Sequence, residues 1–278
     1  MMATTTSFSL PYFLACHSSV PDEYISDSSS PLPKAQRRRH RILMVSDFFY
    51  PNVGGVENHI FQLSQCLICQ GHKVVVLTHA YPSSDSFGVR YLTNGLKVYY
   101  LPRVPIFQQS TLPVFFGSNL RFLRNVVRRE RISIVHAHQA FSTLGLEACT
   151  HTPCLGVRGL GVVFTDHSLF GFADFNSILA NKILKAAVGG AVDAVICVSH
   201  TSKENTALRA CLAPSRIYTI PNATDANEFK PLAGGRSGLK GGPVTIVVLN
   251  RLVYRKGVGL LAMALPEICR RHPLRGRG

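Results

Sequence analysis

Between residues 41 and 222, short apolar runs alternate with stretches of helical periodicity, and this alternation restricts the fold more than any other feature of the sequence. The runs have the length of buried strands. We expect strands at residues 42–45, 74–78, 98–101, 132–136, 162–165, 194–198 and 217–220. Strands that alternate with helices form a parallel sheet whose right-handed crossovers cover both faces. The sequence therefore predicts a doubly wound α/β domain.

Composition divides the chain into four regions. Residues 1–40 are rich in Ser and Thr and are expected to be a disordered tail. The α/β domain is expected over residues 41–232, and the Gly-rich segment 233–243 is expected to be a linker. Residues 244–278 then begin a second domain with a strand at 244–249 and a helix around 260–270. No apolar run reaches the eighteen residues of a membrane span.

The chain is strongly basic, with a net charge of +15. Such a surface attracts nucleic acid, acidic lipid headgroups or phosphorylated metabolites, and charge alone does not choose among them. The basic residues at 37–41 and 121–131 are either a solvated face or a footprint on a membrane surface. Cys66 and Cys69 form a C-x2-C pair within a helical pattern, and no second pair stands at zinc-ribbon spacing. We expect reduced thiols and no metal.

Gly54 and Gly55 follow the first expected strand and precede a helix. Adjacent glycines at a helix N-terminus let a phosphate approach backbone N–H groups, although the same pair also suits a tight turn. The G-x-G-x-x-G fingerprint of nicotinamide dehydrogenases is absent, and the second strand ends in Leu-Thr-His without the acidic residue that binds a ribose. The loop is therefore expected to serve another ligand.

Polar residues also follow three later strands: His136 and His138 the fourth, Asp166 and His167 the fifth, and residues 199–204 the sixth. In a doubly wound sheet the carboxyl ends of the strands border the ligand crevice. The Ser and Thr residues of 199–204 have the alternative role of capping the next helix. We expect one crevice that brings together Gly54, Gly55, His136, His138 and His167.

Two cations, Arg251 and Lys256, occupy the loop after the expected strand of the second domain. They are either surface charge or ligands for a diphosphate leaving group, which fixed cations stabilise.

Four segments together resemble a known family: residues 46–51, 164–174, 197–206 and 251–257. With the Gly-Gly loop and Ile-Pro-Asn ending at Asn222, they are similar to retaining, nucleotide-sugar-dependent glycosyltransferases of the GT-B fold. The more specific resemblance is to the catalytic subunits of phosphatidylinositol N-acetylglucosaminyltransferases, over about residues 41–273.

This resemblance implies transfer of N-acetylglucosamine from UDP-GlcNAc to phosphatidylinositol, the first step of GPI-anchor synthesis. It implies retained configuration, no metal or cofactor, other subunits, and the cytosolic face of the endoplasmic reticulum membrane. Gly54 and Gly55 would face the acceptor and the transferring sugar, and His167 would contact the donor sugar. Arg251 and Lys256 would neutralise the diphosphate. The remaining substrate-binding residues would be His136, His138, Asp166 and Asn222.

The sequence also departs from that family. The family's second domain is longer, has a Glu-x7-Glu motif and is followed by a membrane helix, whereas no two glutamates here have that spacing. We therefore expect no sugar transfer by this chain alone. Residues 145–161, crowded with Gly and Pro, interrupt an expected crossover helix.

Two other functions remain open. The chain is alternatively an inactive form that binds acceptor lipid or partner subunits. A basic nucleic-acid-binding protein fits less well, because the basic residues lack interleaved aromatics and no helix-turn-helix or zinc spacing occurs.

Overall fold

The computed structural model describes residues 38–80, 87–102, 105–107, 110–111, 118–169, 171–172, 175–223, 246–250 and 256–272. The chain divides into two compact units, Met1–Asn222 and Ala223–Gly278. Most of the expected tail and the whole expected linker lie outside the described residues, and the four regions drawn from composition remain predictions.

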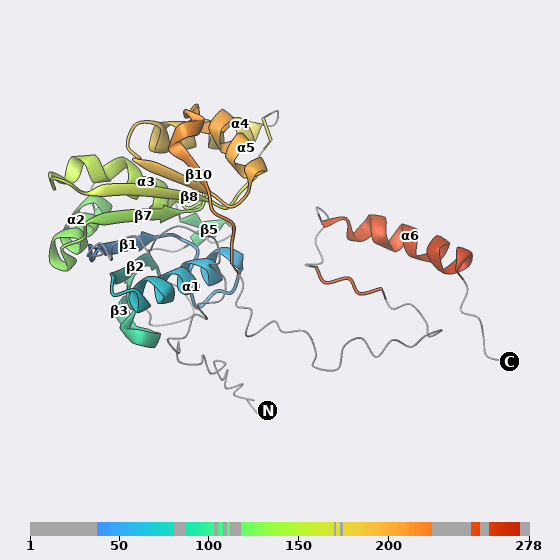
Figure 1. Cartoon of the computed structure of the whole chain (residues 1–278), viewed down its shortest axis with the longest axis horizontal. Coiled ribbons are helices and arrows are strands. Elements are labelled where there is room, and N and C mark those ends of the chain that lie inside the picture. The colour runs from blue at the N-terminus through green and yellow to red at the C-terminus, as the bar shows by residue number, and fades with distance from the viewer. Residues whose placement is uncertain are drawn as a thin grey trace, which may run out of the picture. The chain divides into compact units, whose positions relative to one another are not determined.

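The first unit contains an eight-stranded sheet with the order β10-β9-β8-β7-β1-β2-β4-β3 (Figure 1). Neighbouring strands pair in parallel except β3 and β4, which are antiparallel. The strands are β1 Arg41–Val45, β2 Lys73–His79, β3 Gly88–Tyr91, β4 Lys97–Leu101, β7 Ile134–His138, β8 Gly161–Asp166, β9 Ala194–Cys197 and β10 Ile217–Thr219. The predicted α/β class with a parallel sheet is confirmed.

Helices connect these strands and cover both faces of the sheet (Figure 1). In the first unit they are α1 Gly55–Cys69, α2 Ser118–Glu130, α3 Thr143–His151, α4 Phe175–Gly189 and α5 His200–Ala210. Short 3-10 helices lie at Thr93–Gly95, Thr152–Leu155 and Pro214–Arg216, and β5 Pro105–Phe107 pairs with β6 Ser110–Thr111 in a separate two-stranded sheet. The Ser142 and Ser199 side chains cap α3 and α5.

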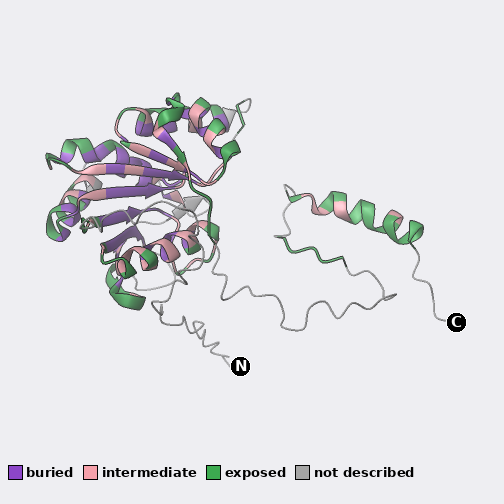
Figure 2. Cartoon of the chain, viewed as in Figure 1, coloured by how far each residue is buried: buried purple, intermediate pink, exposed green. Residues whose placement is uncertain are grey.

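The strands are apolar because both of their faces are buried, as Figure 2 shows. In β1, Ile42 and Met44 pack with the residues of α1, whereas Leu43 and Val45 pack on the opposite face with α2 and α3. A third cluster surrounds Phe164 between β7, β8, β9, α4 and α5. Burial on two faces removes the polar alternation expected of a half-exposed strand.

Three local features differ from expectation. The strand expected at 132–136 is shifted to Ile134–His138, and the exposed edge strand β3 was not predicted. Residues 145–161 are less irregular than expected, because α3 already begins at Thr143 and ends before Pro153. Gly156 and Gly159 adopt positive φ angles of 68° and 72° in the following turn, where glycine is favoured.

The second unit is described only in part. Residues 246–250 have no strand, contrary to expectation for that part of 244–249, and α6 Val258–Arg271 covers the predicted helix. No helix within the described ranges combines the length and the apolar character needed to cross a bilayer.

Candidate functional site

The carboxyl ends of β7 and β8 bring two of the predicted histidines together. The strands pair in parallel with His138 opposite Thr165, so that His138 and His167 leave the same edge of the sheet. The Nδ1 atom of His138 lies 3.4 Å from the Nε2 atom of His167. The predicted convergence at the ends of these strands is thus present for this pair.

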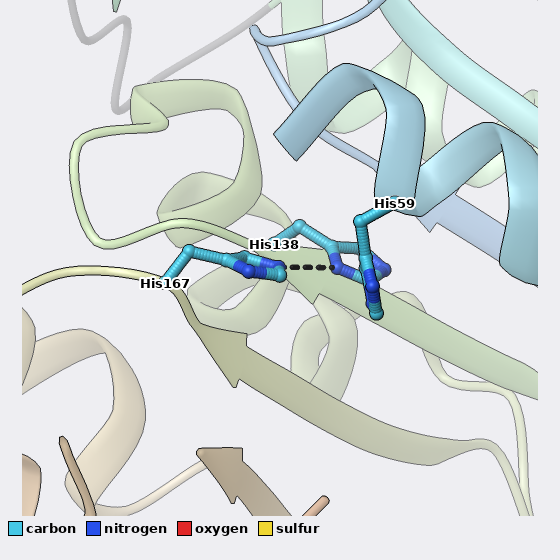
Figure 3. Close-up of side chains that lie close together, drawn as sticks. All are labelled: His59, His138 and His167. Carbon is cyan, nitrogen blue, oxygen red and sulfur yellow. Dashed lines mark hydrogen bonds between the residues drawn. The ribbon is translucent and has the colours of Figure 1, made fainter. Parts of the chain in front are cut away.

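A third histidine, His59, completes the group from the second turn of α1 (Figure 3). Its ring centroid lies 4.8 Å from that of His167 and 5.8 Å from that of His138, and both pairs have edge-to-face geometry. One ring nitrogen of each of the three residues lies within 4.8 Å of the other two. We call His59, His138 and His167 the histidine cluster.

The contact made by the second ring nitrogen of His138, Nε2, selects the tautomer of this residue. His138 Nε2 lies 3.4 Å from the Sδ atom of Met44 on β1. Because a thioether sulfur accepts hydrogen bonds and cannot donate them, Nε2 carries the proton. The Nδ1 lone pair of His138 therefore faces His167.

Burial keeps the cluster neutral. It lowers the pKa of His59, and it lowers the pKa of His138 well below its usual value. Burial also lowers the pKa of His167 to about 3, with a smaller contribution from His59. At neutral pH these imidazoles can exchange a hydrogen bond or coordinate an ion, but they do not supply positive charge to an anionic ligand.

His136 belongs to the interior and lies behind the cluster. Its ring stacks on that of His138 with centroids 4.1 Å apart, and its Nε2 is 2.7 Å from the Thr165 hydroxyl. Burial lowers its pKa to about 3. His136 thus supports His138 from below, and its 7% exposure leaves little of it open to a ligand.

Asp166 points away from the histidine cluster into the protein. Its Oδ2 atom accepts hydrogen bonds from Thr206 at 2.9 Å and Arg209 at 3.1 Å, and its Oδ1 atom accepts from the backbone and hydroxyl of Ser168. Asp166 and Arg209 form an ion pair whose side chains are both fully buried. Although predicted among the substrate-binding residues, this carboxylate instead anchors α5 and the turn that carries His167.

The Gly-Gly loop begins α1 as predicted, with Gly54 as the N-cap and no side-chain cap. The buried carboxylate of Glu57 already lies beside this helix end and accepts a hydrogen bond from Asn52 at 3.1 Å. A Cβ atom on Gly54 would lie 2.3 Å from Glu57 Oε2, whereas one on Gly55 would meet nothing within 4 Å. Since Glu57 already satisfies the positive end of the helix dipole, a phosphate at this end would meet a like charge.

A second buried carboxylate, Asp47, joins the end of β1 to α3. Asp47 accepts hydrogen bonds from the Thr111 hydroxyl at 2.8 Å, the Ser142 hydroxyl at 2.9 Å and the Leu144 backbone N–H at 2.9 Å. The negative charge therefore lies at the positive end of the α3 dipole. This contact fixes the loop that follows His138 against the loop that follows β1.

Three predicted site residues remain to be placed: Asn222, Arg251 and Lys256. Asn222 is exposed at the end of the first unit, and Lys256 is exposed in the second. Asn250 donates a hydrogen bond to the Lys256 carbonyl at 3.3 Å. Arg251 lies outside the described residues.

Sequence reasoning missed His59 and the buried carboxylate of Glu130 at the opposite edge of the sheet. His59 shares the apolar face of α1 with Val56 and Ile60, and a histidine on such a face was the available signal. At the amino ends of β2 and β4, Glu130 accepts hydrogen bonds from Lys73, Lys97 and Tyr99. Burial works to raise its pKa, but these three donors hold it at about 2.

The chain is similar to known proteins over most of its length. Residues 79–174 match the family model described as PIGA (GPI anchor biosynthesis). The chain is 54% identical over 239 residues to a phosphatidylinositol N-acetylglucosaminyltransferase subunit from Arabidopsis thaliana, covering 86% of this chain and 51% of that protein. It is 52% identical over 230 residues to the phosphatidylinositol N-acetylglucosaminyltransferase gpi3 subunit of Schizosaccharomyces pombe, covering 83% and 48%. The chain thus spans about half the length of these relatives.

A solved structure shares the fold. The apo structure of OtsA aligns with a TM-score of 0.53 at 15% sequence identity, covering 84% of this chain and 62% of that one. The structural similarity confirms the α/β fold class. The two relatives and the family model confirm the predicted resemblance.

Proposed function

We propose that this chain, a homologue of phosphatidylinositol N-acetylglucosaminyltransferase subunits over most of its length, carries the acceptor side of a glycosyltransferase. The enzyme transfers N-acetylglucosamine from UDP-GlcNAc to phosphatidylinositol, which begins GPI-anchor synthesis. The observation that carries the proposal is the 54% identity over 239 residues, because it extends through the strand ends that hold the histidine cluster. Of the functions that the sequence left open, sugar transfer is the one that these relatives support.

The histidine cluster has the chemical properties that binding a sugar requires. The cluster presents neutral imidazoles at the carboxyl edge of a parallel sheet, where α/β proteins bind their ligands. Neutral imidazoles donate and accept hydrogen bonds with sugar hydroxyls without repelling or trapping an anion. In this proposal His167 contacts the donor sugar, while Gly54 and Gly55 border the acceptor.

The diphosphate needs cations that the described histidines do not supply. We assign this role to Arg251 and Lys256, which would stabilise negative charge as UDP departs. The role predicts that replacing Arg251 with Ala lowers kcat by about 100-fold in a complete enzyme. A change confined to KM would assign Arg251 to ground-state binding instead.

The proposal includes a membrane surface, because phosphatidylinositol is a membrane lipid. The exposed side of α2 carries Arg121, Arg128 and Arg129, and the chain as a whole has a net charge of +15. Each such cation near an anionic membrane contributes about 1 kcal/mol to binding. We place the enzyme at the cytosolic face of the endoplasmic reticulum membrane with further subunits, and both relatives are named as subunits.

A hybrid protein tests the proposal directly. Residues 41–223 of this chain replace the matching segment of the S. pombe gpi3 subunit, and membranes from cells that lack the native protein receive radiolabelled UDP-GlcNAc. We expect labelled N-acetylglucosaminyl-phosphatidylinositol at a level comparable to that of the native protein. A hybrid that accumulates normally and assembles in the membrane, yet makes no such lipid, would contradict the proposal.

A further inference from the structure

We propose that a cleft at the amino ends of β2 and β4 binds the phosphate group of a phosphate monoester. The two strands pair in parallel, so the cleft lies at the edge of the sheet opposite the histidine cluster and is separate from the proposed site of sugar transfer. Its volume is about 430 Å³, within the range of small-molecule sites. Its polar lining includes His72, Lys73, Tyr91, Asn94, Lys97 and Glu130.

The cleft carries an excess of positive charge. The Nζ atoms of Lys73 and Lys97 lie 2.5 Å and 2.6 Å from the Glu130 carboxylate, so two cations share one anion. The Arg41 guanidinium donates a hydrogen bond to the Glu130 backbone carbonyl at 3.3 Å and adds a third cation. Three positive charges less one negative charge leave +2. A phosphate monoester, which carries nearly two negative charges at neutral pH, matches this excess better than a carboxylate does.

An anion that enters the cleft meets ammonium groups before it meets the carboxylate. The side chain of Lys73 is 44% exposed, whereas that of Glu130 is 5% exposed. The Glu130 oxygens already accept hydrogen bonds from Lys73, Lys97 and Tyr99. Each lysine ammonium has three N–H groups, and its hydrogen bond to Glu130 uses one of them. The other N–H groups can serve a ligand.

The lysines are held in place before a ligand binds. The hydrogen bonds that Lys97 makes with Glu130 and Tyr99 raise the pKa of its ammonium group, which therefore stays charged. The ammonium lies 5.0 Å from the ring centroid of Tyr99 and 5.9 Å from that of Tyr91. A side chain that is already fixed loses less conformational entropy when it binds a ligand.

A further donor comes from the turn before β2. His72 lines the cleft beside Lys73. The Nδ1 atom of His72 accepts a hydrogen bond from the His40 backbone N–H at 3.1 Å, so the proton of the neutral ring is on Nε2. The cleft thus combines a neutral N–H donor with two ammonium groups, and phosphate oxygens accept hydrogen bonds from both kinds of donor.

The two basic segments of the sequence, residues 38–41 and 121–131, meet at this edge. The hydrogen bond from Arg41 joins the end of one segment to the end of the other. A Cβ atom on Gly71 would lie 3.7 Å from Arg39 Nε, so Arg39 also borders the turn before β2. Clustered cations of this kind raise the local concentration of anions.

Binding of inorganic phosphate tests the inference without any assay of sugar transfer, so it stands or falls separately from the proposed function. Calorimetric titration of the full chain at pH 7.5 compares phosphate with chloride at equal ionic strength. Lys73→Gln removes the exposed cation, whereas Lys73→Arg keeps the charge. Lys182→Gln, at an exposed lysine on α4, is the matched control. Circular dichroism verifies that each variant is folded.

We expect Lys73→Gln to weaken phosphate binding by about 10-fold or more, the loss that follows when one hydrogen bond to a charged group is removed. Lys73→Arg and Lys182→Gln should bind as the unaltered chain does. In the unaltered chain, phosphate should also slow amide hydrogen exchange in residues 88–97, and this measurement depends on no variant. Phosphate binding no stronger than chloride binding, equal affinity in folded Lys73→Gln and Lys182→Gln, or unchanged exchange in residues 88–97 would overturn the inference.

Vesicles distinguish the two sources of the phosphate group. Phosphatidylcholine vesicles that contain phosphatidic acid present a phosphate monoester on a lipid, whereas vesicles of equal surface charge that contain phosphatidylserine do not. A preference for phosphatidic acid that Lys73→Gln abolishes would identify a lipid headgroup as the ligand. Binding of inorganic phosphate without such a preference would identify a soluble phosphorylated molecule.

Discussion

The Nδ1 atom of His138 lies 3.4 Å from the Nε2 atom of His167, and this contact joins the ends of β7 and β8 on the edge where an α/β sheet binds its ligands. Both rings are kept neutral by burial. The stability of the chain and the chemistry at this edge therefore depend on the same property, which is the neutral state of these buried rings.

Stability should fall in mild acid. His136 and His167 have folded-state pKa values of about 3, well below the value near 6.5 in an unfolded chain. As the pH falls below about 6.5, these histidines bind protons in the unfolded chain but not in the folded chain. The free energy of unfolding should therefore be highest above pH 6.5 and decrease toward pH 3, by up to about 1.4 kcal/mol per pH unit for each such histidine.

Urea unfolding at pH 7.5 and pH 5.5 measures this effect. His136→Gln should reduce the difference between the two pH values, because it removes one of the buried histidines. Equal unfolding free energies at both pH values in the unaltered chain would show that these rings are not protected from protonation.

The ion pair between Asp166 and Arg209 should be essential to the fold. Replacing Asp166 with Asn leaves the buried guanidinium without its counter-charge, and breaking a buried pair in this way costs about 3–5 kcal/mol. Glu204→Gln, at an exposed position on the same helix as Arg209, is the control and should unfold like the unaltered chain. Denaturant titration distinguishes them, and a loss below about 1 kcal/mol for Asp166→Asn would contradict the structural role.

The two glycines at the start of α1 should respond differently to the same substitution. Gly54→Ala forces the Glu57 carboxylate away from its hydrogen bond with Asn52, so the melting temperature should drop. Gly55→Ala meets no atom and should be tolerated, with a gain of roughly 0.5–1 kcal/mol from the helix preference of alanine.

The Gly55 variant also tests whether the acceptor lies close to the backbone of Gly55. In the hybrid enzyme, Gly55→Ala should lower sugar transfer without loss of stability if the substrate approaches this backbone closely. Unchanged transfer by Gly55→Ala would remove Gly55 from the site, and equal melting temperatures for both variants would contradict the contact between Gly54 and Glu57.

The strands were predictable and parts of the site were not, for physical reasons. Leu43, Met44 and Phe164 lie in strands buried on both faces, so continuous apolar runs revealed them. β3 is exposed throughout and leaves no such signal. The start of β7 was predicted too early, because Ile132 is apolar and buried but precedes the strand.

The direction of a side chain is the part that a sequence pattern does not determine. Asp166 and His167 are adjacent, yet Asp166 points inward to Arg209 while His167 points toward His138. Arg209 is 43 residues away from Asp166 in sequence, and nothing near the aspartate indicates it. His59 joins the cluster through the tertiary packing of α1, and its place on the apolar face of that helix was its only signal in the sequence.

The most direct test of the account is the turnover of the hybrid enzyme with His167→Ala, compared with His200→Ala as an exposed control outside the cluster. Steady-state transfer of N-acetylglucosamine to phosphatidylinositol vesicles is measured at saturating UDP-GlcNAc. We predict that His167→Ala lowers kcat by about 100-fold or more, the scale for removing a group that stabilises the transition state, and that His200→Ala leaves it unchanged. Equal kcat values for the two folded variants would show that the edge formed by β7 and β8 is not where sugar transfer takes place.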